Sequence, residues 1–457
     1  MLTGWKDVAR KNHSYYLLNL GCAKNLVEGE HLAGMLQAAG YAPEPAPEAA
    51  SLICVNTCGF IRPAVEEALE HILALARAKQ PGQTLAVVGC LVGRYGRKLA
   101  RELPEADLLV GPGEAPRLVE HLRTPPPGRL AISPPREIMG LSTPRALATG
   151  PGWAYLRVAD GCEHRCAFCA IPGIRGRLRS RTLTELAQEA TTLGEAGALE
   201  INLVAQDLSS YGLDLADGSS LGKLIERLDA IKLIKWIRLL YMHPDSLDQR
   251  LIEAIANSLK TLPYFDLPLQ HVANRVLKAM RRRRTGAQLR KLLHLVRRRC
   301  PQAVLRTTLL VGHPGEREDD FTELMEFVEE FQFDHQGCFA YQPEAGTASA
   351  RLEAPPAKLA RARQRRVMAL QKKISAAKLK PLKGAVLPVL VLGPHPESEL
   401  LGLGRLARQA PEVDGEVIIT AGQAKPGSLA LCRITKTHAY DLEAELVEGP
   451  GDPLSQA

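Results

Sequence analysis

The 457-residue sequence has no long apolar run. No stretch of about eighteen consecutive apolar residues occurs, which excludes an ordinary membrane-spanning helix. The first residues, MLTGWKDVARKNHS, also lack the apolar segment of a signal peptide. We therefore expect no membrane association and a cytoplasmic location. Hydrophobic residues still make up 46% of the chain, which is enough for two or three domains with buried cores.

Cysteine is scarce as well. Ten cysteines in a chain of this length are too few for a secreted disulfide scaffold. In a reducing compartment, cysteines that cluster more often bind metal than form disulfides. Their positions are therefore the most informative feature of the sequence.

Acidic residues are missing from two long stretches. Residues 274–300 carry eleven Lys and Arg, and residues 357–383 carry ten, with no Asp or Glu in either stretch. Residues 384–448 have the opposite balance, with five basic and nine acidic residues. Such a distribution suggests a charged polymeric partner that touches the chain in two places, although solvated helix faces explain such runs equally well.

Apolar runs and amphipathic segments alternate along the first part of the chain. The runs are YYLLNLG, SLICVNT, TLAVVGC and LLVG, and the amphipathic segments lie near 26–39, 64–79 and 95–103. This alternation predicts a parallel, doubly wound sheet, which we place at residues 13–124. The Pro-rich stretch TPPPGRLAISPPRE then predicts a linker over 125–150.

The same alternation continues over residues 151–380. Six apolar runs are each followed by a helical pattern: AYLRVADG, EINLVAQD, WIRLLYMHP, YFDLPLQH, VLRTTLLVGHPG and DHQGCFAYQP. Eight such units would close a full barrel, so six predict an open, partial β/α barrel with its site at the carboxyl ends of the strands. Over 381–449 the pattern changes to short β runs between turns, which predicts a small antiparallel β-barrel of five strands.

Three cysteines lie close together in the stretch DGCEHRCAFCAIPG. Cys162, Cys166 and Cys169 follow the first strand of the predicted partial barrel. Soft thiolate ligands select zinc or iron–sulfur centres, and a four-iron cluster held by three cysteines keeps one iron open for another ligand. The alternative is a zinc site completed by a distant residue such as His164, but protein zinc sites usually pair one CxxC motif with a second pair of ligands.

The C-x3-C-x2-C spacing with an aromatic residue at Phe168 resembles the radical S-adenosylmethionine superfamily. The resemblance implies that these cysteines hold a 4Fe-4S cluster whose open iron binds S-adenosylmethionine, and that an electron from the cluster cleaves it to a 5'-deoxyadenosyl radical. Phe168, Gln206 and Asp207 are the candidate cofactor contacts. Further candidates at the other strand ends are His243, Gln270, His271, His313 and Tyr341. We assign no catalytic residue beyond the cluster ligands.

A second set of cysteines follows the strands of the first domain. Cys22, Cys58 and Cys90 each come directly after an apolar run. In a parallel sheet these positions meet at the carboxyl edge, where open α/β folds bind their ligands. We therefore predict a second cluster with three cysteine ligands, the alternative being three ordinary buried thiols. We interpret the remaining four cysteines, Cys54, Cys300, Cys338 and Cys432, as core residues.

The chain as a whole resembles the radical methylthiotransferases, which combine these three domains, the last of them called TRAM. The motifs VNTCGFIRPAVEEA, AIPGIRGRLRSR, LVAQDLSSYGLDL and LRTTLLVGHPGEREDDF look most like the branch that modifies small-subunit ribosomal protein twelve. This implies methylthiolation of an aspartate β-carbon with two S-adenosylmethionine molecules and two 4Fe-4S clusters. The chain departs from the usual family pattern at Ala23, where proline is common, and at His313, where an aromatic residue is commoner.

The expected partners follow from this resemblance. They are a basic ribosomal protein, free or in the small subunit, an electron donor, and RNA touched by the basic helices. One alternative is the branch that methylthiolates adenosine in transfer RNA, but its barrel is expected to be basic, whereas residues 384–448 carry a net charge of −4. A second alternative is a zinc-stapled RNA-binding protein without catalysis.

Overall fold

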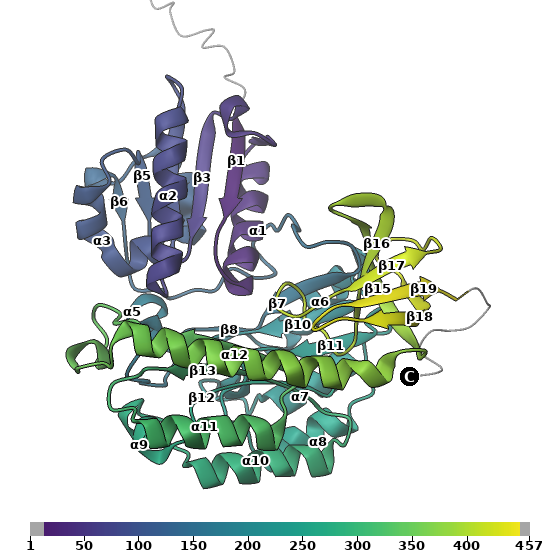
Figure 1. Cartoon of the computed structure of the whole chain (residues 1–457). Coiled ribbons are helices and arrows are strands. Elements are labelled where there is room, and N and C mark those ends of the chain that lie inside the picture. Colours follow the sequence, from purple (N-terminus) through teal and green to yellow (C-terminus); the bar gives the residue numbers. More distant parts are fainter. Residues whose placement is uncertain (1–12, 448–457) are drawn as a thin grey trace, which may run out of the picture. The chain divides into compact units, whose positions relative to one another are not determined.

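The computed structural model describes residues 13–447 and contains two compact units (Figure 1). The first unit comprises the residues up to Ala148 together with Asp160–His164 and Cys169–Arg179. The second comprises Thr149–Ala159, Arg165–Phe168 and the chain from Ser180 onward. Residues 448 and 449 of the predicted last domain lie outside the described range. Within that range, no helix combines the length and apolar character that crossing a bilayer requires.

The first unit is built on a parallel sheet with strand order β2-β1-β3-β4-β5-β6. Its strands are β1 (Ser14–Asn19), β2 (Ala42–Pro43), β3 (Leu52–Thr57), β4 (Thr84–Gly89), β5 (Leu108–Val110) and β6 (Leu130–Ala131). Its helices are α1 (Ala23–Ala38), α2 (Arg62–Ala78), α3 (Cys90–Glu102), α4 (Leu118–Arg123) and α5 (Ile171–Arg175). The prediction of a parallel, doubly wound sheet is confirmed.

Strand β3 shows why helices cover both faces of this sheet. Its side chains point alternately to the two faces, and all six residues are buried. Ile53 and Val55 join a core with residues of α2 and α3, whereas Leu52 and Cys54 join a second core with residues of α1 and α4. A strand buried on both faces reads as a continuous apolar run, which is how SLICVNT appears in the sequence.

The interpretation of residues 125–150 as a linker is corrected by the structure. Leu130 and Ala131 form β6, which pairs with β5 and extends the sheet. Arg129 donates to the Leu103 carbonyl at 3.0 Å, and the Arg145 guanidinium donates to Glu30 Oε2 of α1 at 2.6 Å. Most of the predicted linker is therefore packed against the first domain.

The second unit contains the predicted six parallel strands, in two groups of three. They are β7 (Trp153–Arg157), β10 (Glu200–Val204), β11 (Trp236–Leu239), β12 (Tyr264–Gln270), β13 (Val304–Val311) and β14 (His335–Ala340). An isolated parallel bridge between Ile237 and Thr261 lies at the junction of the two groups. Neighbours in sequence are neighbours in the sheets, as in a partial barrel that is not closed.

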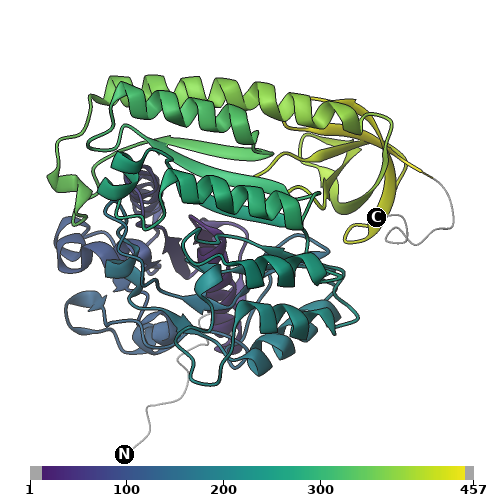
Figure 2. The same cartoon turned by 90° about the horizontal axis from the view of Figure 1, so that it is seen from below.

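Helices follow the strands of this partial barrel, and a long one leads out of it. They are α6 (Leu183–Glu195), α7 (Leu221–Asp229), α8 (Gln249–Asn257), α9 (Asn274–Ala279), α10 (Gly286–Arg299), α11 (Glu318–Phe331) and α12 (Ala357–Leu379). Two short strands, β8 (Ala159–Asp160) and β9 (Arg179–Ser180), flank the three-cysteine loop. Figure 2 shows α12, in light green, running toward the yellow carboxyl-terminal strands.

The carboxyl-terminal strands close into a barrel of order β15-β16-β17-β19-β18. The strands are β15 (Val386–His395), β16 (Ser398–Leu406), β17 (Val417–Ala421), β18 (Leu429–Thr437) and β19 (Leu442–Leu446). The predicted five-stranded barrel is confirmed, with one difference in its pairing. Four pairings are antiparallel, but β17 and β19 are parallel because the chain crosses over between β17 and β18 and then returns along β19.

Buried charges join this small barrel to the partial barrel. Glu200 at the start of β10 accepts from Arg238 Nε of β11 at 2.7 Å, and its Oε2 forms an ion pair with Arg405 Nη2 of β16 at 2.6 Å. Burial alone would raise the pKa of Glu200, but the two guanidinium groups outweigh it and hold the pKa below its usual value. Because both arginines are also buried, each member depends on the others for charge compensation.

Candidate iron–sulfur sites

The loop with Cys162, Cys166 and Cys169 is held by backbone contacts in each unit. In the first unit, the Cys162 amide donates to the Gly176 carbonyl at 3.1 Å. In the second unit, the Ala167 amide donates to the Met280 carbonyl at 3.0 Å, and the Ala167 carbonyl accepts from the Ser349 amide at 2.8 Å. All three thiols are partly exposed, as ligands that must take up a group from solvent need to be. The loop leaves the first strand of the partial barrel, as predicted.

Polar groups from the strand ends surround Cys166. Its Sγ lies 4.0 Å from Nε2 of His243, which follows β11 and also contacts the Arg282 guanidinium. Burial raises the pKa of the Cys166 thiol, and the charge of Arg282 opposes this rise. A nearby guanidinium stabilises the thiolate form that metals require.

Asp207 has a structural role at the ends of two strands. Its carboxylate accepts from the Ser209 amide at 3.0 Å, from the His243 amide at 3.0 Å and from the Ser246 hydroxyl at 2.9 Å. Asp207 therefore connects the ends of β10 and β11 and holds the backbone of His243. Its proposed contact with the cofactor stays a prediction, as does that of neighbouring Gln206.

Phe168 and His313 pack on each other in the second unit. Phe168 lies against a small core of Ala273, Val276 and Met280, and its ring meets that of His313 edge to face at a centroid distance of 6.4 Å. His313 also stacks edgewise on Tyr341 at 5.1 Å. His313 thus fills the place of an aromatic side chain, which explains why the chain tolerates it there. Phe168 therefore supports the cysteine loop through packing.

The other two strand-end candidates lie on the bulge and turn after β12. Gln270 has a positive φ of 70°, and the register with β13 shifts between Leu267 and Gln270. His271 is fully buried, and burial lowers its pKa to about 3. Its Nδ1 accepts from the Ala273 amide at 3.1 Å, so the ring supports the turn that follows.

The second cysteine set converges, as the strand order predicts. Cys22, Cys58 and Cys90 follow β1, β3 and β4, which are adjacent in the sheet. The surroundings of two glycines show how closely the three loops approach one another. A Cβ on Gly21 would lie 2.7 Å from Cys58 Cβ, and a Cβ on Gly59 would lie 2.7 Å from the Cys90 carbonyl. Only glycine allows these loops to approach so closely.

Asn25, one turn into α1, ties these loops together. Its Nδ2 donates to the Leu20 carbonyl at 3.2 Å and to the Thr57 carbonyl at 2.9 Å. Its Oδ1 lies 3.9 Å from Cys22 Sγ and 3.8 Å from Cys90 Sγ. The buried amide therefore contacts the loop before Cys22 and the end of β3 next to Cys58.

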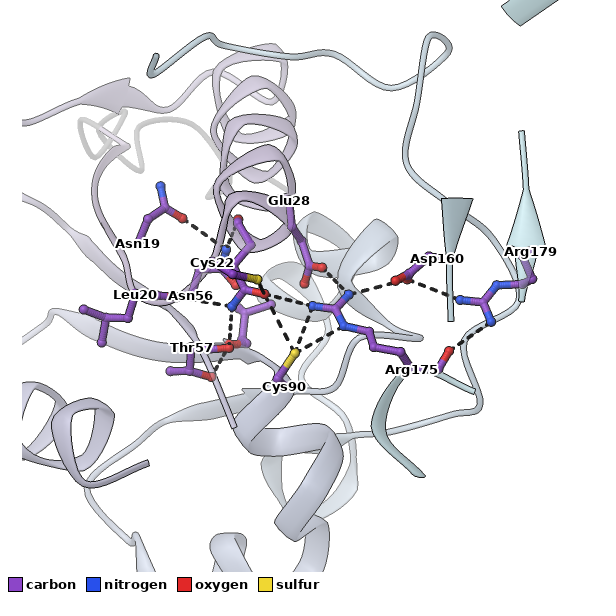
Figure 3. Close-up of polar contacts among 12 residues, drawn as sticks. Asn19, Leu20, Cys22, Glu28, Asn56, Thr57, Cys90, Asp160, Arg175 and Arg179 are labelled. Carbon is purple, nitrogen blue, oxygen red and sulfur yellow. Dashed lines mark hydrogen bonds and ion pairs between the residues drawn. The ribbon is translucent and has the colours of Figure 1, made fainter. Parts of the chain in front are cut away.

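A buried arginine, Arg175 at the end of α5, also reaches this site (Figure 3). Its Nε and Nη2 lie 3.2 and 3.0 Å from Cys90 Sγ. Neither Asn25 nor Arg175 was singled out as a site residue by sequence patterns. Asn25 lies three residues after Cys22 on the same helix, which is a usable signal, but nothing local connects Arg175 with a cysteine 85 positions earlier.

The electrostatics of the second set agree with a site for several thiolates. Burial raises the pKa of Cys58, and the charge of Cys22 adds to the rise. Burial raises the pKa of Cys90 to about 12, and Arg175 opposes it. Thiols that raise each other's pKa ionise together only when a cation binds them. Three converging sulfur ligands fit a thiolate-bound metal cluster.

The remaining cysteines are core residues, as predicted. Cys54, Cys300, Cys338 and Cys432 are buried. Burial raises the pKa of Cys338 to about 12 and that of Cys432 to about 11, so these thiols stay neutral near neutral pH.

Family models match each part of the chain. Residues 14–111 match the Uncharacterized protein family UPF0004, residues 156–328 match the Radical SAM superfamily, and residues 384–447 match the TRAM domain. A three-cysteine loop after the first strand of a partial barrel, within the second of these regions, defines a radical S-adenosylmethionine enzyme. Membership of that superfamily implies a 4Fe-4S cluster and S-adenosylmethionine.

Two relatives extend over nearly the whole chain. The ribosomal protein uS12 methylthiotransferase RimO of Syntrophobacter fumaroxidans is 44% identical, over 94% of this chain and 98% of its own. The protein of the same name from Geobacter sulfurreducens is 43% identical, over the same shares of the two chains. The chain belongs to the RimO family of ribosomal protein uS12 methylthiotransferases. Neither alternative, the transfer RNA enzyme or the zinc-stapled binding protein, is favoured.

A solved structure shows the same fold at low identity. The radical S-adenosylmethionine methyltransferase TsrM from Kitasatospora setae, with cobalamin and a [4Fe-4S] cluster bound, has a TM-score of 0.53 and 16% identity. The match covers 74% of this chain and 77% of that one. The likeness concerns the fold alone.

Proposed function

We propose that this chain methylthiolates the β-carbon of an aspartate in small-subunit ribosomal protein uS12 and carries two 4Fe-4S clusters. Cys162, Cys166 and Cys169 would hold the cluster that binds S-adenosylmethionine. Cys22, Cys58 and Cys90 would hold the second one. Bound there, these groups would supply the radical chemistry that removes hydrogen from the substrate and the methylthio group that takes its place.

The chain's own residues then hold and shield these groups. Hydrogen bonds from Asn25 and the close approach at Gly21 and Gly59 keep the second set of thiols together. The contacts of Ala167 and the packing of Phe168 fix the other loop. Asp207 holds the His243 backbone beside Cys166. No acid or base is required for hydrogen abstraction, so we assign no proton-transfer residue.

The observation that carries the proposal is the convergence of Cys22, Cys58 and Cys90. A radical S-adenosylmethionine enzyme with one cluster needs only the C-x3-C-x2-C loop. Here three more thiols come from three separate strand ends, and glycines stand where any side chain would push them apart. This arrangement supports a group bound between the thiols.

Iron and sulfide counts test the number of clusters. Protein purified and reconstituted without oxygen should contain about eight irons, the content of two four-iron clusters. Cys22→Ala and Cys166→Ala should each lose about half of that iron. Cys300→Ala, which changes a buried cysteine outside both sets, should lose none. If Cys22→Ala keeps the full iron content, the second cluster is refuted.

The substrate is tested by mass spectrometry. Purified, reconstituted enzyme is given isolated ribosomal protein uS12 and, separately, unmodified transfer RNA, with S-adenosylmethionine and a chemical reductant. We expect the added mass of one methylthio group on an aspartate peptide of uS12 and no change in the RNA. Modification of the RNA alone would refute the assignment. The reductant stands in for an electron donor outside this chain.

The acidic small barrel supports a basic protein partner, but less than its net charge suggests. Asp414 accepts from the Tyr264 hydroxyl at 2.6 Å, and Glu412 accepts from the Tyr155 hydroxyl at 2.9 Å, so both serve contacts with the partial barrel. Glu397, in the turn between β15 and β16, and Glu399, the second residue of β16, are exposed. We propose that these two meet the basic ribosomal protein and that the reaction takes place in the cytoplasm.

A lysine groove supports the proposed contact with RNA. It has a volume of about 760 Å³ and lies between α12 and the end of β18. Four exposed lysines of α12 and the turn after it line the groove: Lys372, Lys373, Lys380 and Lys383. Closely spaced lysines attract phosphates. Their binding weakens as salt rises, because the release of counterions from the RNA then gains less free energy.

The RNA contact is tested by fluorescence anisotropy with a labelled single-stranded oligouridylate. Charge reversal at Lys372, Lys373 and Lys380 should weaken binding at least tenfold and flatten its dependence on salt. Reversal at Lys358, Arg361 and Arg365, exposed residues in the other half of α12, changes the same number of charges and should change binding little. Equal losses in both variants would mean that overall charge, not the groove, binds RNA.

A further inference from the structure

Arg175 is a buried cation aimed at one cysteine of the second set. The side chain is 3% exposed, and two of its nitrogens point at Cys90 Sγ from 3.0 and 3.2 Å. The third, Nη1, points the other way, toward Glu28 Oε2 at 2.5 Å and Asp160 Oδ2 at 3.6 Å. Figure 3 shows the guanidinium between the sulfur and the two carboxylates.

Buried acids keep Arg175 in this orientation. Glu28 lies on α1, one turn beyond Asn25, and is 1% exposed. Asp160 is also buried and is shared with Arg179, whose Nη2 lies 3.3 Å away. Glu28 Oε2 and Asp160 Oδ2 place negative charge beside the guanidinium, which stays protonated in proteins. Arg175 is therefore a permanent positive charge.

At the edge that faces Cys90, Nη2 also donates to Asn25 Oδ1 at 3.2 Å, whereas Nε has the sulfur as its acceptor. Buried N–H groups without an acceptor are costly, and a neutral thiol is a weak acceptor. A metal-ligating cysteine is a thiolate, which accepts hydrogen bonds from a guanidinium well. The contact is thus complementary to the ligated form of Cys90.

We propose that Arg175 is a positioning residue of the second cluster, which hydrogen-bonds the ligand sulfur of Cys90 and raises the reduction potential of that cluster. The proposal rests on the proposed function, because it requires a cluster on Cys22, Cys58 and Cys90. Arg175 lies on α5, which begins two residues after Cys169. The segment that leaves the first cysteine loop therefore also sets the electronic properties of the second site.

The direction of the effect follows from charge. Reduction adds one electron and makes a cluster more negative. A fixed positive charge and N–H···S bonds stabilise the reduced form more than the oxidised form, which raises the potential. Burial strengthens both contributions because little water screens them.

The test measures the potential of the second cluster alone. Cys162, Cys166 and Cys169 are replaced by Ala in the full-length chain, and the remaining cluster is titrated with dithionite and followed by electron paramagnetic resonance. In this background, Arg175→Met should keep about four irons and shift the midpoint to a more negative potential. Arg175→Lys keeps the charge but loses the two-nitrogen contact. Its midpoint potential should lie between those of the parent and Arg175→Met.

Two further variants make the test sharp. Arg177→Met removes an exposed guanidinium from the same loop and should leave the midpoint unchanged. Glu28→Gln removes a negative charge beside Arg175 and should shift the midpoint in the opposite direction. It also keeps the test decisive if Arg175→Met does not fold.

Failure of the proposal for Arg175 can be distinguished from failure of the proposed function. If Arg175→Met and Glu28→Gln keep their iron and the midpoint of the parent, the proposal for Arg175 is overturned while the second cluster stands. If the parent with Arg175 intact binds no iron, the proposed function itself is overturned, and the proposal for Arg175 falls with it.

Discussion

His313 shows how one buried side chain ties stability to pH. Its Nε2 lies 2.8 Å from the Ser349 hydroxyl, its Nδ1 lies 3.0 Å from the Pro314 carbonyl, and the ring is enclosed between Phe168 and Tyr341. Burial lowers the pKa of His313 to about 4. An unfolded histidine has a pKa of about 6.5, so the unfolded chain binds the proton first as pH falls.

The first prediction concerns this histidine. Since the folded pKa lies below the unfolded one, stability is lost between about pH 6.5 and pH 4, and roughly 2 kcal/mol is lost from pH 7 to pH 5. His313→Phe cannot be protonated and should remove that part of the pH dependence. Urea unfolding of both proteins at the two pH values measures it. An equal loss in the variant would contradict the assignment.

The second prediction concerns Asn25. Asn25→Ala leaves the buried carbonyls of Leu20 and Thr57 without their donor and should lower the free energy of unfolding by about 1–3 kcal/mol. Because the loops of Cys22 and Cys58 then come apart, the variant should also lose about half of its iron on reconstitution. Gln37→Ala, which removes a hydrogen bond to Tyr15 farther along the same helix, should keep its iron.

At the scale of elements, the turn after β3 and the start of α3 are held against each other without intervening side chains. Arg94 of α3 donates to the carbonyls of Gly59 and Phe60 at 2.8 and 3.1 Å, which fixes the turn after Cys58. A methyl group on Gly59 would meet backbone atoms of Cys90 and Leu91, and backbone cannot move aside cheaply. The packing of these two segments therefore depends on glycine.

The third prediction is that Gly59→Ala is destabilising. The added methyl should separate the start of α3 from the turn after β3 and lower the free energy of unfolding by about 1–3 kcal/mol. Gly222→Ala in α7 is the control, because the nearest atom to its added methyl lies 3.6 Å away. Thermal unfolding compares the two. Similar melting temperatures for both variants would mean that these segments can relax.

Much of this element structure could be predicted from the sequence. Strands such as β3 and β13 carry strong apolar runs, and their alternation with helical patterns indicates parallel sheets. Strand β6 was missed because it has only two residues and lies among prolines, where local patterns favour a linker. The parallel pairing of β17 with β19 was missed because strand order within a small barrel depends on contacts distant in sequence.

Some residues of the candidate site can likewise be predicted from the sequence and others cannot. Cys162, Cys166 and Cys169 lie within eight residues, so their spacing alone indicates a cluster. The second set could be inferred only through the predicted order of strands. Asn25 and Arg175 were not predicted as site residues, because their roles depend on which loops meet in space.

For the whole molecule, the Arg238–Glu200–Arg405 network joins the small barrel to the partial barrel. Glu200 is the first residue of β10, at the opposite end of that strand from Asp207, and Arg238 is the third residue of β11. Arg238 also lies over the ring of Tyr264 at 4.7 Å, and Arg405 over that of Trp153 at 5.7 Å. The two barrels therefore share one buried electrostatic core.

The fourth prediction tests this shared core. Glu200→Gln removes the carboxylate charge with which both buried guanidinium groups pair and should cost about 3–5 kcal/mol of unfolding free energy. Glu66→Gln, which breaks the exposed pair with Arg62, should cost less than about 1 kcal/mol. Chemical denaturation measures both. If Glu200→Gln costs no more than Glu66→Gln, the network does not couple the barrels.

The wide separation of Cys22, Cys58 and Cys90 along the chain has a consequence for biosynthesis. These thiols meet only after β1, β3 and β4 have aligned, whereas the other three are neighbours as soon as their loop is translated. Because these strands precede Cys162 in the chain, a first domain that folds during synthesis would bring the dispersed trio together before the local loop has been made.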